Sequence, residues 1–538
     1  MSFAELLDHV RGMGRFQIIY AILLAIPVFM LASHNLLQNF TAATSEHHCQ
    51  VHININNTPY TNLTGNNQQP EKRHRFLTMQ WQLLDSNATV TNLTELETEP
   101  CADGWVYDKS IFTSTIITEW DLVCDYRQLK QMAQSIYMAG ILAGGIIFGG
   151  LSDRFGRRSP LIWCYLQMAV TGTSTAFSPS FTAYCIFRFL TRMAISGTEM
   201  NGVSLSVEWT STHTRAVVGT MYGYCYTIGQ FILAGVAYAI SNWRWLQLVV
   251  SLPYFISFIY SWWFAESTRW LVIAGRPDEA VKQLQTVARI NQKKEEGDKL
   301  NIEVLRSNMQ KEIASAKSSH TFIDLVRTPV LRRISFCLCF VWTLYASIPV
   351  RFTCFAYYGL AMDLQNFVVN IFLIQLVLGA VDFPAKFISV LRISFIGRQF
   401  TQALTLILSF STCLTLLHCV LLSRSEILRT VLAVVGKGCL AASFNCVVLY
   451  TSELYPTVIR QTGMGLSNTM AHLDSIIAPL VKMLEEYIPF LPLTIYGAAP
   501  IISCIAATSL PETLNMPLPE TIQEVETRLV ESIGRQEQ

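Results

Sequence analysis

Three ionisable side chains interrupt long apolar stretches of the sequence. Lys386 ends the segment Val-Asp-Phe-Pro-Ala-Lys, and His472 and Asp474 lie in Met-Ala-His-Leu-Asp-Ser. Charge within a hydrocarbon layer is costly, so such groups commonly mark a binding site or an ion pathway. Lys386 could attract an anion, or it could pair with Asp382 one helical turn earlier. His472 and Asp474 could likewise contact a ligand or pair with each other.

Two more polar side chains lie in apolar stretches. Glu199 is a further acid, and either Lys386 or Arg192 could be its partner. The sequence does not choose between these two cations. Asn35 stands at the outer end of the first apolar stretch, where its amide could donate to a carboxylate or bond a neighbouring helix.

A cluster of charge follows directly after the apolar run 138–151. Residues 149–158 read Gly-Gly-Leu-Ser-Asp-Arg-Phe-Gly-Arg-Arg, and abrupt charge of this kind marks the point where a helix leaves the bilayer. A generic basic stop-transfer segment would account for the arginines, but not for the acid or for the spacing of the glycines. We therefore expect a turn with paired charges, formed by Asp153, Arg154, Gly156, Arg157 and Arg158.

The composition is that of a polytopic membrane protein. Of 538 residues, 51% are apolar and only 14% are charged, against about 25% charged in a soluble protein. A net charge of +1 and the lack of a basic tract argue against a nucleic-acid partner. We find no nucleotide-cradling loop, no His/Cys metal spacing and no hint of a Ser-His-Asp triad, so we expect no enzyme, no metal and no cofactor.

Twelve apolar stretches are long enough to cross a bilayer. We predict an all-α membrane protein with two pseudo-symmetric six-helix halves at 16–264 and 331–510. A cytoplasmic segment 1–15 precedes them, a cytoplasmic linker 265–330 with amphipathic helices at the membrane surface joins them, and a polar cytoplasmic tail 511–538 follows. The predicted spans are 16–37, 132–151, 161–178, 181–206, 217–240, 245–264, 334–360, 368–391, 401–422, 429–451, 461–484 and 491–510.

The polar stretch 41–131 is predicted to be an extracellular, glycosylated loop. Four sequons cluster within it and a fifth lies at its edge. The sequon asparagines are Asn39, Asn56, Asn62, Asn87 and Asn92. Three cysteines in the loop leave one without a partner inside it. Twelve spans then place both termini in the cytoplasm, and the predicted inside loops carry six arginines against three outside.

Weak repeats relate the two halves. Glu208 precedes Arg215 by seven residues, and Glu453 precedes Arg460 by the same seven at an offset of 245. Gly-Arg at 156 recurs at 397, and Pro-Glu-Thr at 511 loosely repeats Ala-Glu-Ser at 265. Such duplication is typical of transporters that bind substrate between their halves. We expect ion pairs on the inner side to hold one state and part in the other, formed among Glu208, Arg215, Glu266, Arg269, Arg398, Glu453 and Arg460.

Several motifs resemble a known family. Residues 149–158 resemble the loop signature of the major facilitator superfamily, and the stretches 266–271 and 453–463 resemble solute carrier family 22. Within it, residues 32–40, 118–124 and 436–444 are similar to the organic anion transporters, near the renal types one and three and the olfactory type. The resemblance implies a plasma-membrane carrier that exchanges amphipathic organic anions for a dicarboxylate. Its expected partners are the substrate, the dicarboxylate and membrane lipid, and the resemblance assigns no oligomeric state.

The resemblance also implies a substrate site. Aromatic side chains in spans usually serve packing, but flat anions need ring-lined walls, so we expect ring stacking here. The expected substrate-binding residues are Asn35, Tyr226, Trp342, Tyr357, Tyr358, Lys386, Phe444, Asn468, His472 and Asp474.

The chain departs from the family pattern inside this site. Relatives have an anion-contacting arginine at the position of His472, and neutral residues at the position of Glu199. Between Trp342 and Phe355 the chain has about eight residues more than its relatives, which affects the placement of the following tyrosines. Because histidine titrates near about pH 6.5 whereas arginine is always charged, we expect weaker coupling to dicarboxylates or uptake that rises at acidic pH.

Other functions stay open from the sequence. Asp474 and Glu199 favour a carrier of organic cations or zwitterions, whereas Lys386 opposes it. A relative that binds ligand without moving it is a further alternative. The superfamily loop by itself would also fit a sugar carrier.

Overall fold

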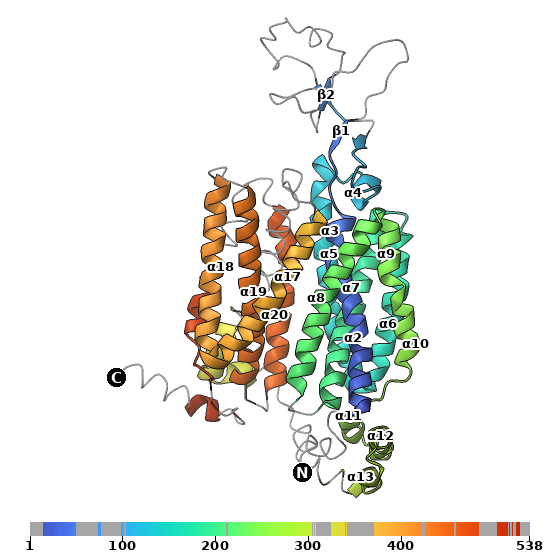
Figure 1. The fold of residues 1–538 in the computed structure, drawn as a ribbon, viewed down its shortest axis with the longest axis vertical. Coiled ribbons are helices and arrows are strands. Elements are labelled where there is room, and N and C mark those ends of the chain that lie inside the picture. The colour runs from blue at the N-terminus through green and yellow to red at the C-terminus, as the bar shows by residue number, and fades with distance from the viewer. Residues whose placement is uncertain are drawn as a thin grey trace, which may run out of the picture.

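The computed structural model describes most of the two predicted halves and parts of the segments between them. Described are residues 14–49, 74–76, 98–101, 104–210, 214–303, 305, 307, 324–338, 341, 371–421, 426–456, 459–483, 503–514, 516, 519 and 523–527. Figure 1 shows two bundles of long helices side by side, with short strands beyond one end and small helices beyond the other.

The first bundle is built from the helices expected at the first six spans. These helices are α2 (Arg15–Leu36), α5 (Arg127–Phe155), α6 (Arg158–Ala176), α7 (Phe181–Trp209), α8 (Arg215–Ala239), α9 (Trp243–Ser251) and α10 (Pro253–Ser261). The sixth predicted span is divided between α9 and α10. Pro253 is the first residue of α10, where its missing amide hydrogen costs nothing to the new helix.

The second bundle contains four long helices in the part of the chain that the structure describes. They are α17 (Ile371–Phe395), α18 (Arg398–Leu421), α19 (Glu426–Leu454) and α20 (Arg460–Met483). The short helix α15 (Asp324–Arg327) precedes the seventh predicted span, most of which falls outside the described residues. Trp342, Tyr357 and Tyr358 fall there too. Of the twelfth predicted span, residues 503–508 are described and helical.

Four helices among the described residues are long and apolar enough to cross a membrane by length and composition. They cover Arg15–Thr41, Cys124–Phe155, Ile371–Ile393 and Val434–Leu454. Their outer faces and those of their neighbours carry large apolar side chains that soluble proteins would bury, such as Ile146, Trp163 and Phe395, each about two thirds exposed or more. Exposed side chains of this kind fit a lipid environment.

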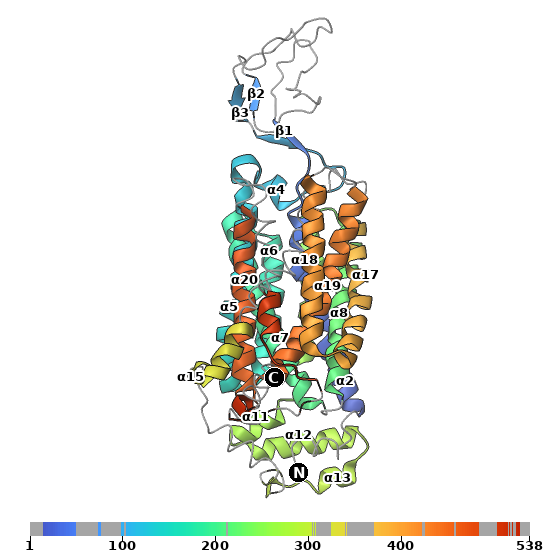
Figure 2. The same cartoon turned by 90° about the vertical axis from the view of Figure 1, so that its left-hand side faces the viewer.

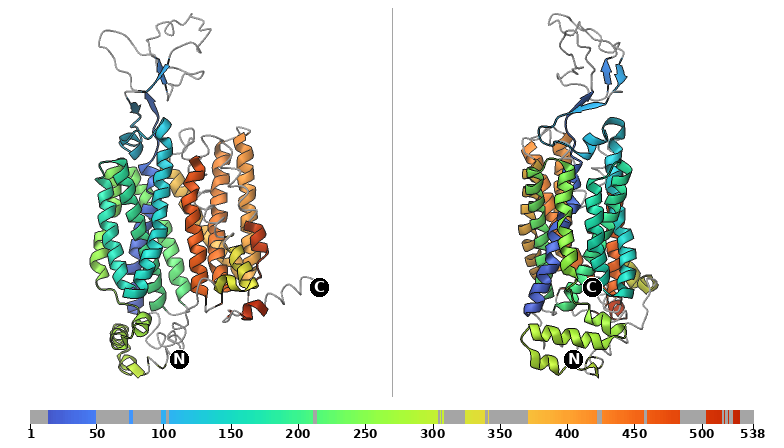
Figure 3. Two further views of the ribbon diagram at one scale, coloured as in Figure 1. Left: turned by 180° about the vertical axis from the view of Figure 1, so that it is seen from behind. Right: turned by 90° about the vertical axis from the view of Figure 1, so that its right-hand side faces the viewer.

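In the part of the chain that the structure describes, two helix pairs make the main contacts between the bundles. Helix α5 packs against α20, and α8 packs against α17. Figure 3 shows the two bundles side by side from behind. Aromatic rings fill the second contact: Phe383 of α17 stacks on Tyr224 of α8 at 5.3 Å and on Phe231 at 6.1 Å between ring centroids. The contact between α8 and α17 therefore combines stacked rings with polar side chains, among them Lys386, Gln230 and Asp382.

The strands lie at the end of the bundle opposite to the small helices (Figure 2). Strand β1 (His47–Cys49) pairs antiparallel with β4 (Trp105–Tyr107), and β2 (His74–Phe76) pairs antiparallel with β3 (Thr98–Pro100). Cys101 is disulfide-bonded, whereas Cys124 carries a thiol. The predicted sequons at Asn56, Asn62, Asn87 and Asn92 lie outside the described residues.

Asn39 needs a correction. It lies in the one-turn helix α3 (Gln38–Thr41), directly after α2, and its side chain is buried, with 8% of the residue exposed. The hydroxyl of Thr41, the third residue of the sequon, donates to the carbonyl of Leu37 at 3.2 Å and is buried as well. A bulky glycan needs an exposed asparagine, so the expectation of glycosylation at Asn39 is wrong for this fold.

One glutamate connects the loop before α5 to the outer end of the first bundle. Glu119, the last residue of α4 (Ile116–Glu119), accepts from the indole nitrogen of Trp243 at 2.7 Å and forms a salt bridge with Arg244. Arg244 also donates to the carbonyl of Ser178 at 3.0 Å, after the end of α6. One carboxylate thereby ties the loop to the outer ends of two helices.

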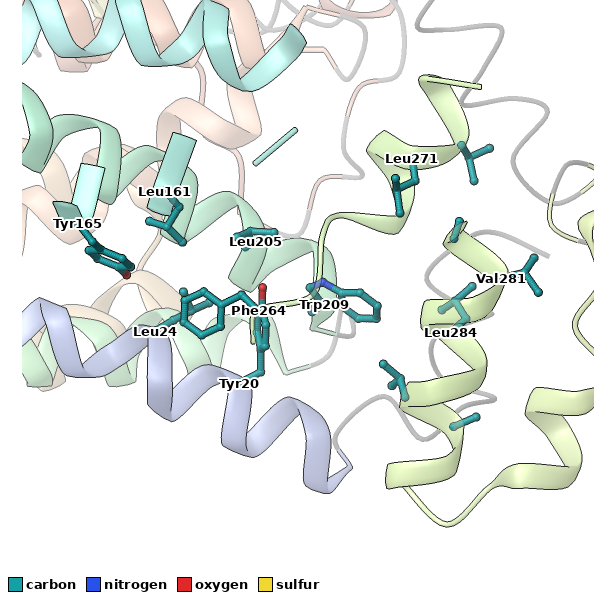
Figure 4. Close-up of a cluster of buried hydrophobic side chains, with 14 of the residues drawn as sticks. Tyr20, Leu24, Leu161, Tyr165, Leu205, Trp209, Phe264, Leu271, Val281 and Leu284 are labelled. Carbon is teal, nitrogen blue, oxygen red and sulfur yellow. The ribbon is translucent and has the colours of Figure 1, made fainter. Parts of the chain in front are cut away.

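The linker after the first bundle is helical and covers that bundle's inner end. It consists of α11 (Thr268–Ile273), α12 (Pro277–Ile290) and α13 (Lys294–Asp298). Val281 and Leu284 of α12 belong to one buried apolar cluster with Leu271 of α11 and Trp209 of α7, and Figure 4 labels all four side chains. Amphipathic helices were the expectation, but the apolar face of α12 is buried against protein, and so does not lie on lipid.

The linker also completes the start of α2. The side-chain oxygen of Asn291 accepts from the backbone amide of Phe16 at 3.0 Å, and its nitrogen donates to Gln17 at 2.9 Å. Amides in the first turn of a helix have no partner within the helix, so an acceptor from elsewhere stabilises it.

Replacing Asn291 by alanine is expected to destabilise the protein by about 1–2 kcal/mol, the usual cost of a lost helix cap. Thermal unfolding of the detergent-solubilised protein would measure it. Arg289→Ala, an exposed change near the end of the same helix, is the control. Equal melting temperatures for the two variants would contradict this role of Asn291.

Candidate functional site

Lys386 of α17 reaches across to the other bundle. Its Nζ donates to the carbonyl of Gly223 at 3.0 Å and to the hydroxyl of Thr227 at 3.0 Å, both on α8. Lys386 forms no salt bridge among the residues that the structure describes. A cation held by two neutral oxygens keeps its charge available for an anion.

The alternative pairing of Lys386 with Asp382 is not what the structure contains. Asp382 is paired instead with Lys437 of α19, with 3.7 Å between Nζ and Oδ1. Lys437 also donates to the carbonyl of Leu378 at 2.7 Å, and Gln230 donates to Asp382 at 3.4 Å. Asp382 and Lys437 are both buried, so this pair satisfies two charges that would be costly to bury alone.

Asn35 is the centre of a polar cluster inside the first bundle. Its side-chain oxygen accepts from Arg192 of α7 at 2.7 Å and from the Tyr137 hydroxyl of α5 at 3.3 Å. Its nitrogen donates to the Tyr226 hydroxyl of α8 at 3.4 Å. Asn35 thus bonds three neighbouring helices, and Asn35 and Tyr226 are both only partly buried.

Glu199 takes Arg192 as its partner. The Arg192 Nη1 and Glu199 Oε1 atoms are 3.7 Å apart, two helical turns from each other along the same face of α7. The Arg192 side chain is 7% exposed and that of Glu199 is 37% exposed. Of the two partners left open by the sequence, Lys386 is not the one found here. Arg192 was missed as a site residue, although an arginine within an apolar span was the signal that could have found it.

Fewer of the predicted site residues on the second bundle are among those that the structure describes. His472 of α20 is half-buried. Phe444 of α19 is 46% exposed. The side chains of Asn468 and Asp474 lie outside what the structure describes, as do Trp342, Tyr357 and Tyr358. Among the expected site residues, Asn35 and Tyr226 bond directly, while Lys386 binds the residue next to Tyr226.

The loop between α5 and α6 is built on one glycine and one glutamate. Gly156 has φ +89°, a left-handed conformation that favours glycine. The Glu266 carboxylate accepts from the backbone amides of Arg157 at 2.9 Å and Arg158 at 3.2 Å, which open α6. A side chain at position 156 would collide with that carboxylate. An anion at a helix start is favoured by the exposed amides and the helix dipole.

The second bundle repeats this arrangement. Gly397 has φ +112°, and Glu512 accepts from the amides of Arg398 at 2.9 Å and Gln399 at 3.0 Å at the start of α18. A Cβ added to Gly397 would lie 2.6 Å from the Glu512 carboxylate. The sequence repeats are therefore also structural repeats, and the loop of the second half is as complete as the first despite its missing second arginine.

In the second half, one ion pair forms between two of the charged residues expected on the inner side. Glu453 forms a salt bridge with Arg398 at 2.9 Å and accepts from the Thr513 hydroxyl at 2.6 Å. Arg460, which follows Glu453 by seven residues, donates to the carbonyl of Tyr455 at 3.3 Å. The repeated seven-residue spacing of acid and arginine therefore does not mark an ion pair in the second half.

The same end of the first bundle holds the remaining predicted charges. Asp153 pairs with Arg157 at 2.8 Å, and the exposed Arg154 lies over the ring of Phe155. Glu208 is near the charges of Arg157 and Arg269. The side chain of Arg215 lies outside the described residues. Each salt bridge found among the described residues of the two loops stays within one bundle.

The fold can be compared with known proteins on this basis. The chain matches the family described as sugar (and other) transporter over residues 88–525. The inward-open xylose transporter XylE from E. coli shares the fold with a TM-score of 0.58 at 16% identity, covering 75% of this chain and 90% of that chain. The proton:xylose symporter XylE bound to 6-bromo-6-deoxy-D-glucose gives 0.58 at 14%, with the same coverage. The protein is thus a multi-pass membrane transporter with the fold of the major facilitator superfamily.

Closer relatives narrow this class. Solute carrier family 22 member 6-A of Xenopus laevis is 54% identical, covering 98% of this chain and 95% of the relative. Organic anion transporter 3 of Mus musculus is 52% identical, again over 98% and 95%. The chain belongs to solute carrier family 22. Its relatives are transporters, and it is not an enzyme.

Proposed function

We propose that this protein carries amphipathic organic anions across the plasma membrane by alternating access, in exchange for a dicarboxylate. Relatives at about half identity include proteins named organic anion transporter 3. The observation that carries the proposal is Lys386, a cation between the two bundles whose described partners are neutral oxygens. A site of this kind attracts negative charge.

The proposal includes an arrangement in the membrane. Residues 16–264 and 331–510 form the two moving halves, with both termini, the linker 265–330 and the tail 511–538 in the cytoplasm. Support comes from the linker helices, which lie at the end opposite to the strands of the sequon-bearing loop. The salt bridges of the two cytoplasmic loops act within each half, so we propose that they keep the halves rigid while these rock against each other.

The test is uptake of labelled para-aminohippurate by cells that lack anion carriers of their own. Expression of the chain should raise uptake several-fold over empty cells, and preloading the cells with glutarate should raise it further. Unlabelled para-aminohippurate should compete, and tetraethylammonium should not. Inhibition by tetraethylammonium instead would favour the second candidate, a carrier of cations or zwitterions, for which the part-exposed Glu199 carboxylate is the supporting observation. Binding of para-aminohippurate without uptake would indicate a sensor.

A further inference from the structure

The guanidinium of Arg192 lies beside expected substrate-binding residues, although the sequence did not predict Arg192 as one of them. Arg192 of α7 bonds Asn35, which in turn bonds Tyr226. Helix α7 packs against α5, and α5 packs against α20 of the second bundle, which carries His472.

Two nitrogens of the Arg192 guanidinium make no hydrogen bond to the described residues. Nη1 is engaged by Asn35 at 2.7 Å, while Nε is buried and without a hydrogen-bond partner among the described residues. Nη2 likewise makes no hydrogen bond within that part of the chain. An arginine side chain binds a carboxylate best through two nitrogens, and here the Glu199 carboxylate stays 3.7 Å away, beyond hydrogen-bond distance.

Glu199 changes what such a site can accept. Its side chain is 37% exposed, whereas that of Arg192 is 7% exposed, so a ligand that reaches the guanidinium meets the Glu199 carboxylate beside it. Glu199 offsets the Arg192 charge when no ligand is bound. A second negative charge on the ligand would be repelled, because like charges in a site of low dielectric oppose each other strongly.

We propose that Arg192 receives the carboxylate of the substrate, in place of the span-eleven arginine that His472 replaces, and that Glu199 makes the site select monocarboxylates over dicarboxylates. This inference rests on the proposed transport of organic anions. Exchange with a dicarboxylate, as in the proposed function, is then slower than exchange with a monocarboxylate.

The alternative is that Arg192 only positions Asn35 and Tyr226. A positioning residue would change the maximal rate for all substrates alike. A residue that contacts the carboxylate changes the KM or Ki, and does so differently for monoanions and dianions.

The experiment measures KM for para-aminohippurate and Ki for glutarate, corrected for the amount of protein at the cell surface. Arg192→Gln should raise the KM about tenfold or more, the usual effect of losing a hydrogen bond to a charged group, and Arg192→Lys should recover part of it. Glu199→Gln should lower the Ki of glutarate roughly tenfold relative to that of para-aminohippurate. Arg289→Gln, an exposed change on α12, serves as the control and should leave both values unaltered.

Two results would overturn the inference. One is an unchanged KM in Arg192→Gln, with or without a lower maximal rate. The other is an unchanged ratio of glutarate to para-aminohippurate inhibition in Glu199→Gln. If the unaltered chain takes up no anion, the proposed transport fails, and the same variants are then compared by thermal shift of the purified protein with para-aminohippurate. A shift lost in Arg192→Gln would still support the Arg192 contact, and an equal shift would overturn it.

Discussion

Lys386→Met is expected to lower para-aminohippurate uptake by on the order of tenfold to a hundredfold, the worth of a hydrogen bond to a charged group. The side chain stays unbranched and is only one atom shorter, but it loses the charged group that the two oxygens of α8 bind. The loss of the Lys386 charge leaves Asp382 paired, because Asp382 forms its salt bridge with Lys437. The loss should therefore appear in transport and not in folding. Initial uptake rates, divided by surface abundance, would measure it.

Two companion variants separate charge from shape at this position. Lys386→Arg keeps a cation and should retain a substantial part of the uptake. Thr227→Val removes one of the two acceptors at nearly constant volume and should reduce uptake less than Lys386→Met, because the carbonyl of Gly223 remains. Uptake by Lys386→Met equal to that of the unaltered chain would show that the substrate does not depend on this cation.

Gly156→Ala is expected to destabilise the first half by on the order of 3 kcal/mol. An alanine at φ +89° costs about 1–2 kcal/mol, and its Cβ would displace the Glu266 carboxylate, whose charge-assisted bonds to the amides opening α6 are worth about as much again. We expect a lower melting temperature in detergent and little protein at the cell surface.

Gly150→Ala is the matched control, because it lies less than two helical turns earlier in α5, and a Cβ there would meet nothing within 4 Å. It should fold normally or be slightly more stable, since alanine favours helices. Glu266→Gln keeps the shape of the side chain and removes its charge, so its melting temperature should lie between those of Gly156→Ala and Gly150→Ala. If the Gly156→Ala and Gly150→Ala variants have the same melting temperature, the turn does not depend on Gly156.

The loop after α5 and the loop after α17 show that the two halves of this chain share a structural element. Gly156 with Glu266, and Gly397 with Glu512, use the same geometry to start α6 and α18. The glutamate arrives from the far end of each half in sequence, so it closes each half into one unit. Gly397→Ala should consequently mirror Gly156→Ala in the second half.

Much of this architecture was determined by the sequence alone. Apolar runs of sufficient length placed the long helices, because backbone groups in a hydrocarbon layer must bond within the segment. The glycine-and-arginine loop at 156 and its copy at 397 indicated the duplication, since a left-handed turn requires glycine wherever it recurs. Lys386 could be predicted as a site residue because a cation is costly within a hydrocarbon layer and is retained there mainly for function.

The partners of these residues were decided only by the tertiary structure. Arg192, and not Lys386, lies beside Glu199; Arg398, and not Arg460, pairs with Glu453. Sequence spacing determines which residues share a face of one helix, but the rotation of each helix and its packing against others determine which faces meet. Asn35 contacts three other helices for that reason, and the cluster that it forms with Arg192 and Tyr226 exists only once α2, α7 and α8 are packed together.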